Sequence, residues 1–444
     1  MKKIVLELAK IVLFFIILWW VIVHITYILR NDTDEKENLM GFYAEEKNSL
    51  DAVFIGSSTM WASLNPLVMY NERGFTSYNI ATSAQRPSSL KYLIKEAQKY
   101  QSDALYVIDV SNFVYDQSVW EEQNEGSLRR VTDGLKYSWN RFLCNYEQIK
   151  GKSNKISYYF DIIKYHSEYR NFFHNISHWN FEKENTSKGW LYNDSVEVVS
   201  YTWNQKSNVQ TNIDEKAEEE LYQLINFCDN SNAKYLFIFS MSTVLDENKS
   251  KYISDIINSR GYDVFNFNDY WKEIGMDETM DFYNAGHTNL LGAEKISKYF
   301  ANYLDEKYQF PDNQDDSWNE LAKYMENIIL DGKNKIYSGN YIGEVKVKVD
   351  NIDNDEITFV NNTNCPQSLL YAWYVNEKRG EDYECIYQQW YTTENTFQYQ
   401  FSEDKEYSVI TFVKGSENEA LFKYKEVAII HYDYQSKEWV IELY

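Results

Sequence analysis

Two short segments far apart in the chain carry the residue types of nucleophilic acyl chemistry. Asp51–Met60 is an apolar run that ends abruptly in Gly-Ser-Ser, and Asp281–Asn289 contains an imidazole flanked by carboxylate and amide side chains. A serine hydroxyl needs a neighbouring base to lose its proton at neutral pH, and histidine can serve as that base. Ser58 and His287 are therefore predicted to be the nucleophile and general base of a serine hydrolase or acyltransferase.

These segments resemble blocks of the SGNH (GDSL-type) hydrolase superfamily. Gly56-Ser57-Ser58 resembles the first block, in the form found in cell-envelope members such as the teichoic-acid D-alanylation protein and the alginate O-acetyltransferases. Tyr78–Gln85 resembles the second block, with Ala84 where the family has glycine, and Val107–Asn112 resembles the third, with Val110 in place of a glycine. The order and spacing of the blocks over residues 49 to 308 carry the resemblance, because no single block is specific.

The resemblance implies a role for each of these residues. Ser58 would attack an ester carbonyl, and the backbone N–H groups of Ser58 and Ala84, with the Asn112 amide, would stabilise the oxyanion. The group that orients His287 stays open. The family motif is Asp-x-x-His, but here the acid position is Asn284, and Asp281 is the nearest carboxylate.

An inactive protein is the alternative interpretation of the same residues. Asn284, Ala84 and Val110 all depart from the family pattern. A chain that had lost catalysis could still bind glycan or a protein partner through the old cleft, as a scaffold at the cell surface. Gly-Ser-Ser after an apolar run is also an ordinary strand-to-turn sequence.

Short strands and helices alternate around these motifs, so the expected fold is α/β, an SGNH/flavodoxin-like parallel sheet with flanking helices. In such sheets the ligand sites lie at the carboxyl ends of the strands. An aromatic-rich insert, about residues 113–214, is expected to form a wall of the substrate cleft. The predicted strands are Ala52–Ile55, Ser77–Ala81, Ala104–Val110, Lys234–Ser240 and Asp263–Phe267, and the predicted helices include Ser89–Tyr100, Glu215–Cys228, Lys249–Ser259 and Leu290–Leu304.

The carboxyl-terminal part of the chain has a different periodicity. Residues 311–334 are expected to be a linker and a short helix, and residues 335–444 contain seven short strand-like runs separated by turn residues. This pattern predicts an all-β immunoglobulin-like sandwich, and the tyrosine-rich runs resemble the "three-tyrosine" modules found beside bacterial surface enzymes. Trp373, Trp390 and Tyr391 would either fill its core or stack on sugar rings.

The amino terminus predicts a membrane anchor. The stretch Ile11–Leu29 has no formally charged residue apart from what His24 carries, and it is long enough to span the ~30 Å hydrocarbon core. Lys2, Lys3 and Lys10 precede it, whereas acidic residues follow Arg30. By the positive-inside rule, residues 1–30 are a cytoplasmic start and a transmembrane signal anchor, and the domain of residues 31–310 lies outside the cell.

Composition limits the remaining classes of function. A chain of 444 residues is too long for one core, and a net charge of −23 argues against nucleic acid as a partner. The four cysteines show no metal-binding spacing, so neither a metal nor another cofactor is expected, and pairing of Cys365 with Cys385 stays open.

Taken with the resemblance, these features predict an extracytoplasmic, membrane-anchored acyltransferase or esterase. It would move an acetyl or similar acyl group to or from a cell-wall or capsular glycan. In the families that it resembles, a membrane-bound O-acyltransferase supplies the acyl donor, and such a protein is the expected partner.

Overall fold

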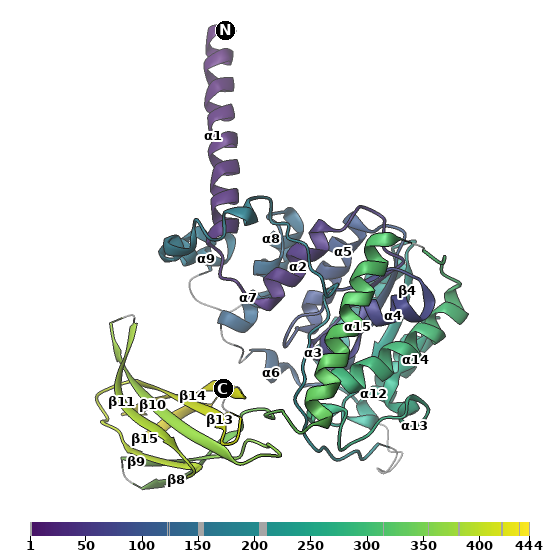
Figure 1. The fold of residues 1–444 in the computed structure, drawn as a ribbon. Coiled ribbons are helices and arrows are strands. Elements are labelled where there is room, and N and C mark those ends of the chain that lie inside the picture. The colour runs from purple at the N-terminus through teal and green to yellow at the C-terminus, as the bar shows by residue number, and fades with distance from the viewer. Residues whose placement is uncertain are drawn as a thin grey trace.

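The computed structural model describes residues 2–121, 123, 125–149, 155–203, 211–313, 315–353, 355–380, 382–418, 421–434 and 436–443. Figure 1 shows a single helix, α1 (Lys2–Leu29), that projects from an α/β domain, and a separate β-rich region at the carboxyl end of the chain. The predicted class, a mixed α/β domain followed by a β region, is confirmed. α1 is also long and apolar enough to cross a membrane.

A parallel five-stranded sheet forms the centre of the α/β domain. Its strands lie in the order β2-β1-β3-β4-β5, and every neighbouring pair is parallel. This is a common order for doubly wound sheets, in which the chain switches direction across the sheet between β1 and β3. The strands are β1 (Ala52–Ile55), β2 (Ser77–Asn79), β3 (Leu105–Asp109), β4 (Lys234–Phe239) and β5 (Val264–Asn266).

Helices cover both faces of the sheet. Along β1, Val53 and Ile55 belong to a core that includes α5, α11 and α12, whereas Ala52 and Phe54 belong to a second core with α3 and α14. This alternation follows from the two-residue period of a strand, and it explains why the strands are apolar throughout. The helices of this domain are α2 (Asp34–Ala44), α3 (Ser58–Ser63), α4 (Pro66–Arg73), α5 (Leu90–Tyr100), α11 (Glu215–Asp229), α12 (Glu247–Ser259), α13 (Trp271–Ile274), α14 (Leu290–Tyr308) and α15 (Asp316–Tyr337).

The insert between β3 and α11 has two parts. Its first part is helical and packs against α1 and α2. Its second part, residues 181–203, has no regular secondary structure and crosses the α/β domain. The helical elements are α6 (Gln117–Glu121), α7 (Glu125–Gly134), α8 (Trp139–Gln148), α9 (Ile156–Tyr159), α10 (Ile162–Tyr165) and the 3₁₀ helices η3 (His166–Asn171) and η4 (Ile176–Asn180).

The carboxyl-terminal region consists of two antiparallel sheets that share one core. One has the order β11-β10-β13-β14-β15 and the other the order β12-β9-β8. Trp373 is fully buried in this core, stacked on Phe397, so it is not available to stack on a sugar. The strands are β8 (Val347–Asp353), β9 (Glu356–Asn361), β10 (Leu369–Arg379), β11 (Asp382–Thr392), β12 (Thr396–Gln400), β13 (Tyr407–Gly415), β14 (Phe422–Asp433) and β15 (Glu438–Leu443).

The sequence did not predict β11. This strand pairs only with β10, at the edge of its sheet, and most of its side chains are exposed on both faces. An edge strand of this kind has no apolar alternation, so the pattern that identified the other strands is missing. Trp390 lies on β11 and remains 69% exposed, so it is the member of the predicted aromatic set that a ligand could reach.

Candidate active site

A tight turn after β1 presents Ser58. The strand ends at Ile55, and Ser58 is the first residue of α3. The turn needs glycine at position 56, because a Cβ atom there would lie 2.5 Å from the Cβ atom of Asp109. Ser58 therefore sits at the carboxyl end of β1, beside the switch point of the sheet, where doubly wound domains place their ligands.

A two-stranded hairpin presents His287. β6 (Phe282–Asn284) pairs with β7 (His287–Thr288), and Asn284 lies directly opposite His287 across a two-residue turn. The Asn-x-x-His spacing thus makes the two residues cross-strand neighbours. The turn is held by Thr243, whose backbone N–H and hydroxyl both donate to the carbonyl of Ala285, at 3.1 and 2.6 Å.

Ser58, His287 and Asn284 form a continuous hydrogen-bonded relay. The distance from Ser58 Oγ to His287 Nε2 is 2.7 Å, and that from His287 Nδ1 to Asn284 Oδ1 is 2.8 Å. The Gly286 N–H also donates to Asn284 Oδ1, at 2.9 Å. Because a backbone N–H needs an acceptor, the amide atom that faces the imidazole is the oxygen. Nδ1 then carries the proton, which leaves Nε2 free to accept the proton of Ser58.

The imidazole is half-buried and neutral at physiological pH. Burial lowers the pKa of His287 from its usual 6.5 to about 4, since a charged ring would lose solvation in this environment. Tyr283 stacks on the ring, with centroids 5.3 Å apart. A neutral imidazole is the form that can accept a proton from serine.

Asp281 does not contact the imidazole, so of the two candidates it is Asn284 that lies beside the ring. The carboxylate of Asp281 accepts hydrogen bonds from Lys295 Nζ at 2.6 Å and from the backbone N–H of Asp277 at 2.7 Å. The side chain is buried against the start of α14, where a Cβ atom at Gly292 would lie 2.5 Å from the carbonyl oxygen of Asp281. The carboxylate thus stabilises this loop, while Asn284 occupies the position beside the imidazole.

The residues predicted to form the oxyanion hole come together beside the nucleophile turn. The backbone N–H of Thr82 donates to the carbonyl of Gly56, at 3.0 Å, which places the loop after β2 next to this turn. Asn112 Nδ2 donates to the carbonyl of Gln85 at 2.7 Å. Ala84 has a φ of 46°, a left-handed conformation that favours glycine.

Asp109 is a site residue that sequence analysis missed. It ends β3 and is buried beneath the nucleophile turn. Its carboxylate accepts from Thr59 Oγ1 at 3.2 Å, Ser240 Oγ at 2.9 Å and the Ser111 N–H at 2.9 Å. Burial raises the pKa of Asp109, although these hydrogen bonds oppose the rise. Asp109 thus links the carboxyl ends of β1, β3 and β4 through hydrogen bonds. The sequence feature that could have identified it is a polar residue at the end of a buried strand.

The second part of the insert joins the two halves of the site. The Leu191 N–H donates to the carbonyl of Trp61 on α3, at 3.1 Å, and Trp190 Nε1 donates to the carbonyl of Ala62, at 2.9 Å. Further along, the Glu197 N–H donates to the carbonyl of Phe282 on β6, at 2.8 Å. This segment therefore fixes the helix of Ser58 relative to the hairpin of His287.

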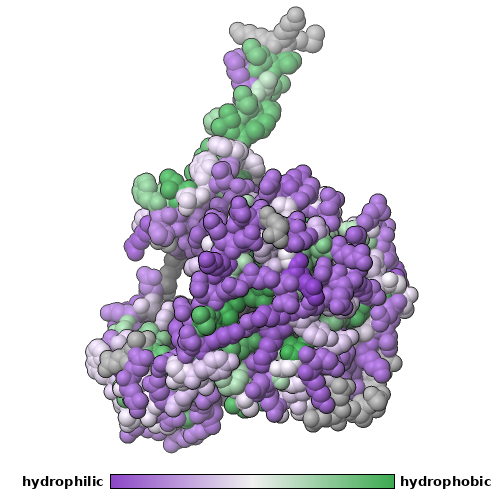
Figure 2. Space-filling model, turned by 45° about the vertical axis from the view of Figure 1, so that its right-hand side comes forward, coloured by the Kyte–Doolittle hydropathy of each residue, from purple (hydrophilic) through white to green (hydrophobic). Residues whose placement is uncertain are grey.

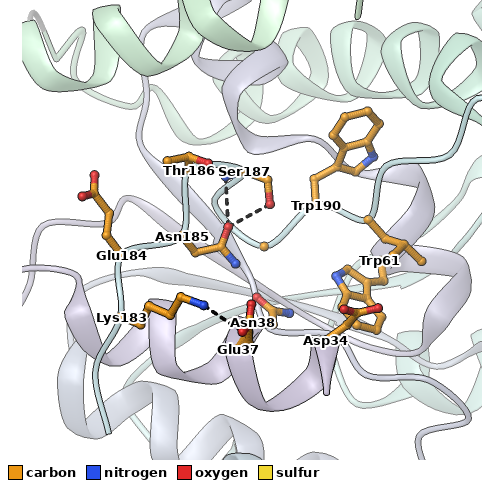
Figure 3. Close-up of a pocket in the computed structure, with 12 residues that line it drawn as sticks. Asp34, Glu37, Asn38, Trp61, Lys183, Glu184, Asn185, Thr186, Ser187 and Trp190 are labelled. Carbon is orange, nitrogen blue, oxygen red and sulfur yellow. Dashed lines mark hydrogen bonds and ion pairs between the residues drawn. The ribbon is translucent and has the colours of Figure 1, made fainter. Parts of the chain in front are cut away.

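A polar pocket of about 390 Å³ opens between α2 and the same segment. Figure 3 shows Trp61 and Trp190 at one end of it and the Lys183–Glu37 ion pair at the other. Trp61 follows Ser58 by one turn of α3, so the pocket adjoins the helix of Ser58, but Ser58 itself does not line it.

Potential metal ligands do not cluster among the described residues. These residues contain no group of three or more His, Cys, Asp or Glu side chains that could hold a metal ion. All four cysteines are unpaired, including Cys365 and Cys385.

Comparison with known proteins does not assign this chain to a family. No family model matches it, and no curated protein matches it. One solved structure that it matches is an engineered protein with 10% sequence identity, in which the alignment covers 88% of this chain and 96% of the other. The TM-score of 0.14 is too low to support an argument.

Proposed function

We propose that this protein is a serine-dependent acyltransferase or esterase of SGNH type that acts on acylated glycans of the cell envelope. The observation that carries the proposal is the relay from Ser58 through His287 to Asn284, with both hydrogen bonds shorter than 3 Å. The position of Ser58 after β1 and of Asn112 after β3 in a doubly wound sheet also supports it.

In the proposed first step, Ser58 attacks the ester carbonyl. A bond forms between Oγ and the carbonyl carbon while His287 Nε2 takes the hydroxyl proton, and the carbonyl electrons move to the oxygen. Backbone N–H groups at Ser58 and Ala84 and the second amide hydrogen of Asn112 would hold this oxyanion. When the carbon–alkoxide bond breaks, the imidazolium returns the proton to the leaving alcohol.

In the second step, the acyl group leaves Ser58. His287 deprotonates a glycan hydroxyl in a transferase, or water in an esterase, and the acceptor oxygen attacks the acyl carbon. The bond between this carbon and Ser58 Oγ then breaks, and the imidazolium returns its proton to Oγ. Asn284 holds the neutral imidazole in the required tautomer, as asparagine does in Cys-His-Asn enzymes, but it supplies no charge to stabilise the imidazolium. Slow turnover is therefore expected. A carboxylate placed at position 284 should increase the rate strongly.

The proposed compartment depends on α1. With α1 in the membrane and lysines on its amino-terminal side, the α/β and β regions would lie outside the cell. The carboxyl-terminal sheets are proposed to be an immunoglobulin-like sandwich, supported by the pairing of the first, second and fifth strands in one sheet. A membrane-bound O-acyltransferase remains the proposed donor partner.

Covalent labelling and product analysis test the proposal together. The purified full-length chain should release acetate from an O-acetylated glycan or transfer it to an acceptor glycan, and Ser58→Ala should abolish both reactions. Ala62→Ser on the same helix is a control variant outside the relay. Full activity of Ser58→Ala would reject the mechanism.

An inactive glycan-binding scaffold is the second candidate. The observation that favours it is the amide in place of an acid beside His287. Under that proposal, Ser58→Ala and His287→Ala would retain both glycan binding and the cellular phenotype. Loss of the phenotype in either variant, with glycan binding retained, would exclude the scaffold.

A further inference from the structure

The outer end of α1 is built into the α/β domain. Residues 26–30 are buried, and Arg30, which directly follows α1, is fully buried. Its guanidinium binds the carboxylate of Asp161 with Nε at 2.9 Å and Nη2 at 2.8 Å. It also donates to the carbonyls of Asp133 and Leu135, at 2.7 and 2.9 Å. These contacts therefore fix the direction of α1 relative to the α/β domain.

Asp161 is shared among three arginines. Arg141 approaches it at 2.7 Å and Arg129 at 3.4 Å, in addition to Arg30. Burial opposes ionisation of Asp161, but the arginines, Arg141 foremost, keep its pKa below the usual value. Removing one member of such a buried network would leave an uncompensated charge, which is strongly destabilising. The network thus holds the insert rigidly around the base of α1.

Apolar side chains point outward from the part of the insert that surrounds this base. We define the collar as residues 156–180, which contain α9, α10, η3 and η4. η3, η4 and α10 pack against α1, and Figure 2 shows apolar surface beside the base of the helix. The exposed apolar residues of the collar are Ile156 (60%), Phe160 (41%), Ile163 (47%), Tyr169 (64%), Phe173 (83%) and Ile176 (53%).

Two tryptophans of α1 join the helix to the collar. Trp19 packs edge-on against Tyr137 and Phe160, with centroids 5.7 and 5.9 Å apart. Trp20 packs against Trp179, at 5.5 Å. Both tryptophans lie where α1 enters the protein. Aromatic residues in this position are typical of a membrane–water interface.

The length of exposed helix requires the bilayer to reach the collar. Among the α1 side chains that the structure describes, those of Ile4–Trp20 are exposed, and the next five residues are already half-buried. At 1.5 Å per residue the exposed stretch is about 26 Å long, less than the ~30 Å hydrocarbon core. Its inner third also contains the Glu7–Lys10 ion pair. A bilayer that covers this helix must therefore extend to the level of Trp19 and Trp20, which is the level of the collar.

The charge of this region also differs from that of the chain. The collar is formally neutral, with Lys164 and Arg170 balanced by Asp161 and Glu168, whereas the whole chain carries −23. Among the charged residues, Lys155, Lys164 and Arg170 are exposed in or beside the collar. An apolar surface rimmed by basic side chains suits an anionic lipid headgroup layer.

We propose that the collar is a membrane-binding surface whose apolar side chains insert into the outer headgroup region of the lipid bilayer around α1. The inference rests on α1 spanning the membrane, but it does not depend on the proposed catalysis. Because the short helices of the collar leave backbone groups that need water, the collar lies in the interface and not in the hydrocarbon core. Two attachments, helix and collar, would fix the height and tilt of the Ser58 site above the lipid.

Site-directed spin labelling of the full chain in vesicles of phosphatidylcholine and phosphatidylglycerol tests this surface. Labels would be placed at Phe173→Cys and Ile163→Cys, in a background in which Cys365 and Cys385 are replaced by serine. Tyr337→Cys, an exposed aromatic at the end of α15 remote from α1, is the matched control. Phe14→Cys on α1 reports whether the helix itself is inserted.

For each label, the measured quantity is the ratio of its accessibility to oxygen, which dissolves in lipid, to its accessibility to a nickel chelate, which stays in water. At the collar positions this ratio should be several-fold higher than at position 337. It should also be lower than at position 14. Aqueous values at 173 and 163 with a lipid value at 14 would overturn the collar while retaining the span. An aqueous value at 14 would overturn both. Protection of the collar from both reagents in pure lipid vesicles would indicate contact between copies of this chain. Protection only in native membranes would indicate a partner protein. Either result would reject lipid as the occupant.

Discussion

Asn284 faces His287 across the two-residue turn between β6 and β7, with its side-chain oxygen 2.8 Å from Nδ1. A neutral amide holds the imidazole where a carboxylate is the more common partner. The contact fixes the tautomer that leaves Nε2 free for Ser58, but it does nothing to stabilise the imidazolium. Several measurable properties depend on this difference.

Asn284→Asp is expected to increase activity. An adjacent carboxylate favours the imidazolium and should raise the pKa of His287 by about 1–3 units. Since the orienting carboxylate of a Ser-His-Asp triad contributes up to ~10⁴ in kcat, an increase in kcat of more than about tenfold is expected. Steady-state kinetics on an acetyl ester measure it. Asn284→Ala, the matched control, should lower kcat, and equal rates for both variants would contradict the assigned contact.

The pH dependence of the native protein follows from the pKa of about 4 for His287. Neutral imidazole thus persists to low pH in the folded protein, and the acid limb of kcat/KM should have its midpoint near pH 4. Between pH 6.5 and 4 the unfolded chain takes up a proton at this residue before the folded chain does. The stability contributed by this residue is therefore present above pH 6.5 and is lost as the pH falls through 4. An acid limb at pH 6.5 would contradict a buried, uncompensated imidazole.

Asp281→Asn should affect stability more than catalysis. The substitution removes the charge that pairs with Lys295 but keeps one acceptor oxygen, so a loss of about 1–2 kcal/mol in the free energy of unfolding is expected. Urea denaturation measures this loss, and kcat/KM of the folded variant should stay within a few-fold of the native value. A drop in kcat/KM as large as that of His287→Ala would instead restore Asp281 to the relay.

Ala84→Gly should stabilise the fold. The native φ of 46° at this position is unfavourable for alanine by about 1–2 kcal/mol, and glycine adopts it freely. After the greater unfolded-state entropy of glycine is considered, a gain of up to ~1 kcal/mol is expected. Ala97→Gly, inside α5, is the control and should lose about 1 kcal/mol. Similar losses in both variants would argue against a strained backbone at Ala84.

The sequence predicted those features that depend on local pattern. The apolar runs around Ser58 and Asn112 identified β1 and β3, because a strand buried on both faces is continuously apolar. The block spacing identified Ser58 and His287, which the fold brings to 2.7 Å. The direction in which a loop side chain points is not a local property, so the sequence could not separate Asn284 from Asp281. That choice depends on Lys295, which lies one helix later in the chain.

Features that depend on distant packing were not predictable. The polar residue that closes β3 pointed to Asp109, but its contacts with the hydroxyl groups of Thr59 on α3 and Ser240 after β4 could not be predicted from the sequence. The packing around the outer end of α1 was also not predictable from the sequence. Hydropathy extends the apolar run to Leu29, but the last residues of α1 are apolar because the insert buries them.

Reaction with a fluorophosphonate probe tests the central claim most directly. The probe forms a covalent bond only with a serine that an adjacent base activates. Peptide mapping of the labelled full-length protein should place the modification on Ser58, with labelling abolished in Ser58→Ala and greatly slowed in His287→Ala. Labelling of Ser57, or absence of label at Ser58 in the folded native protein, would contradict a catalytic Ser58–His287 pair.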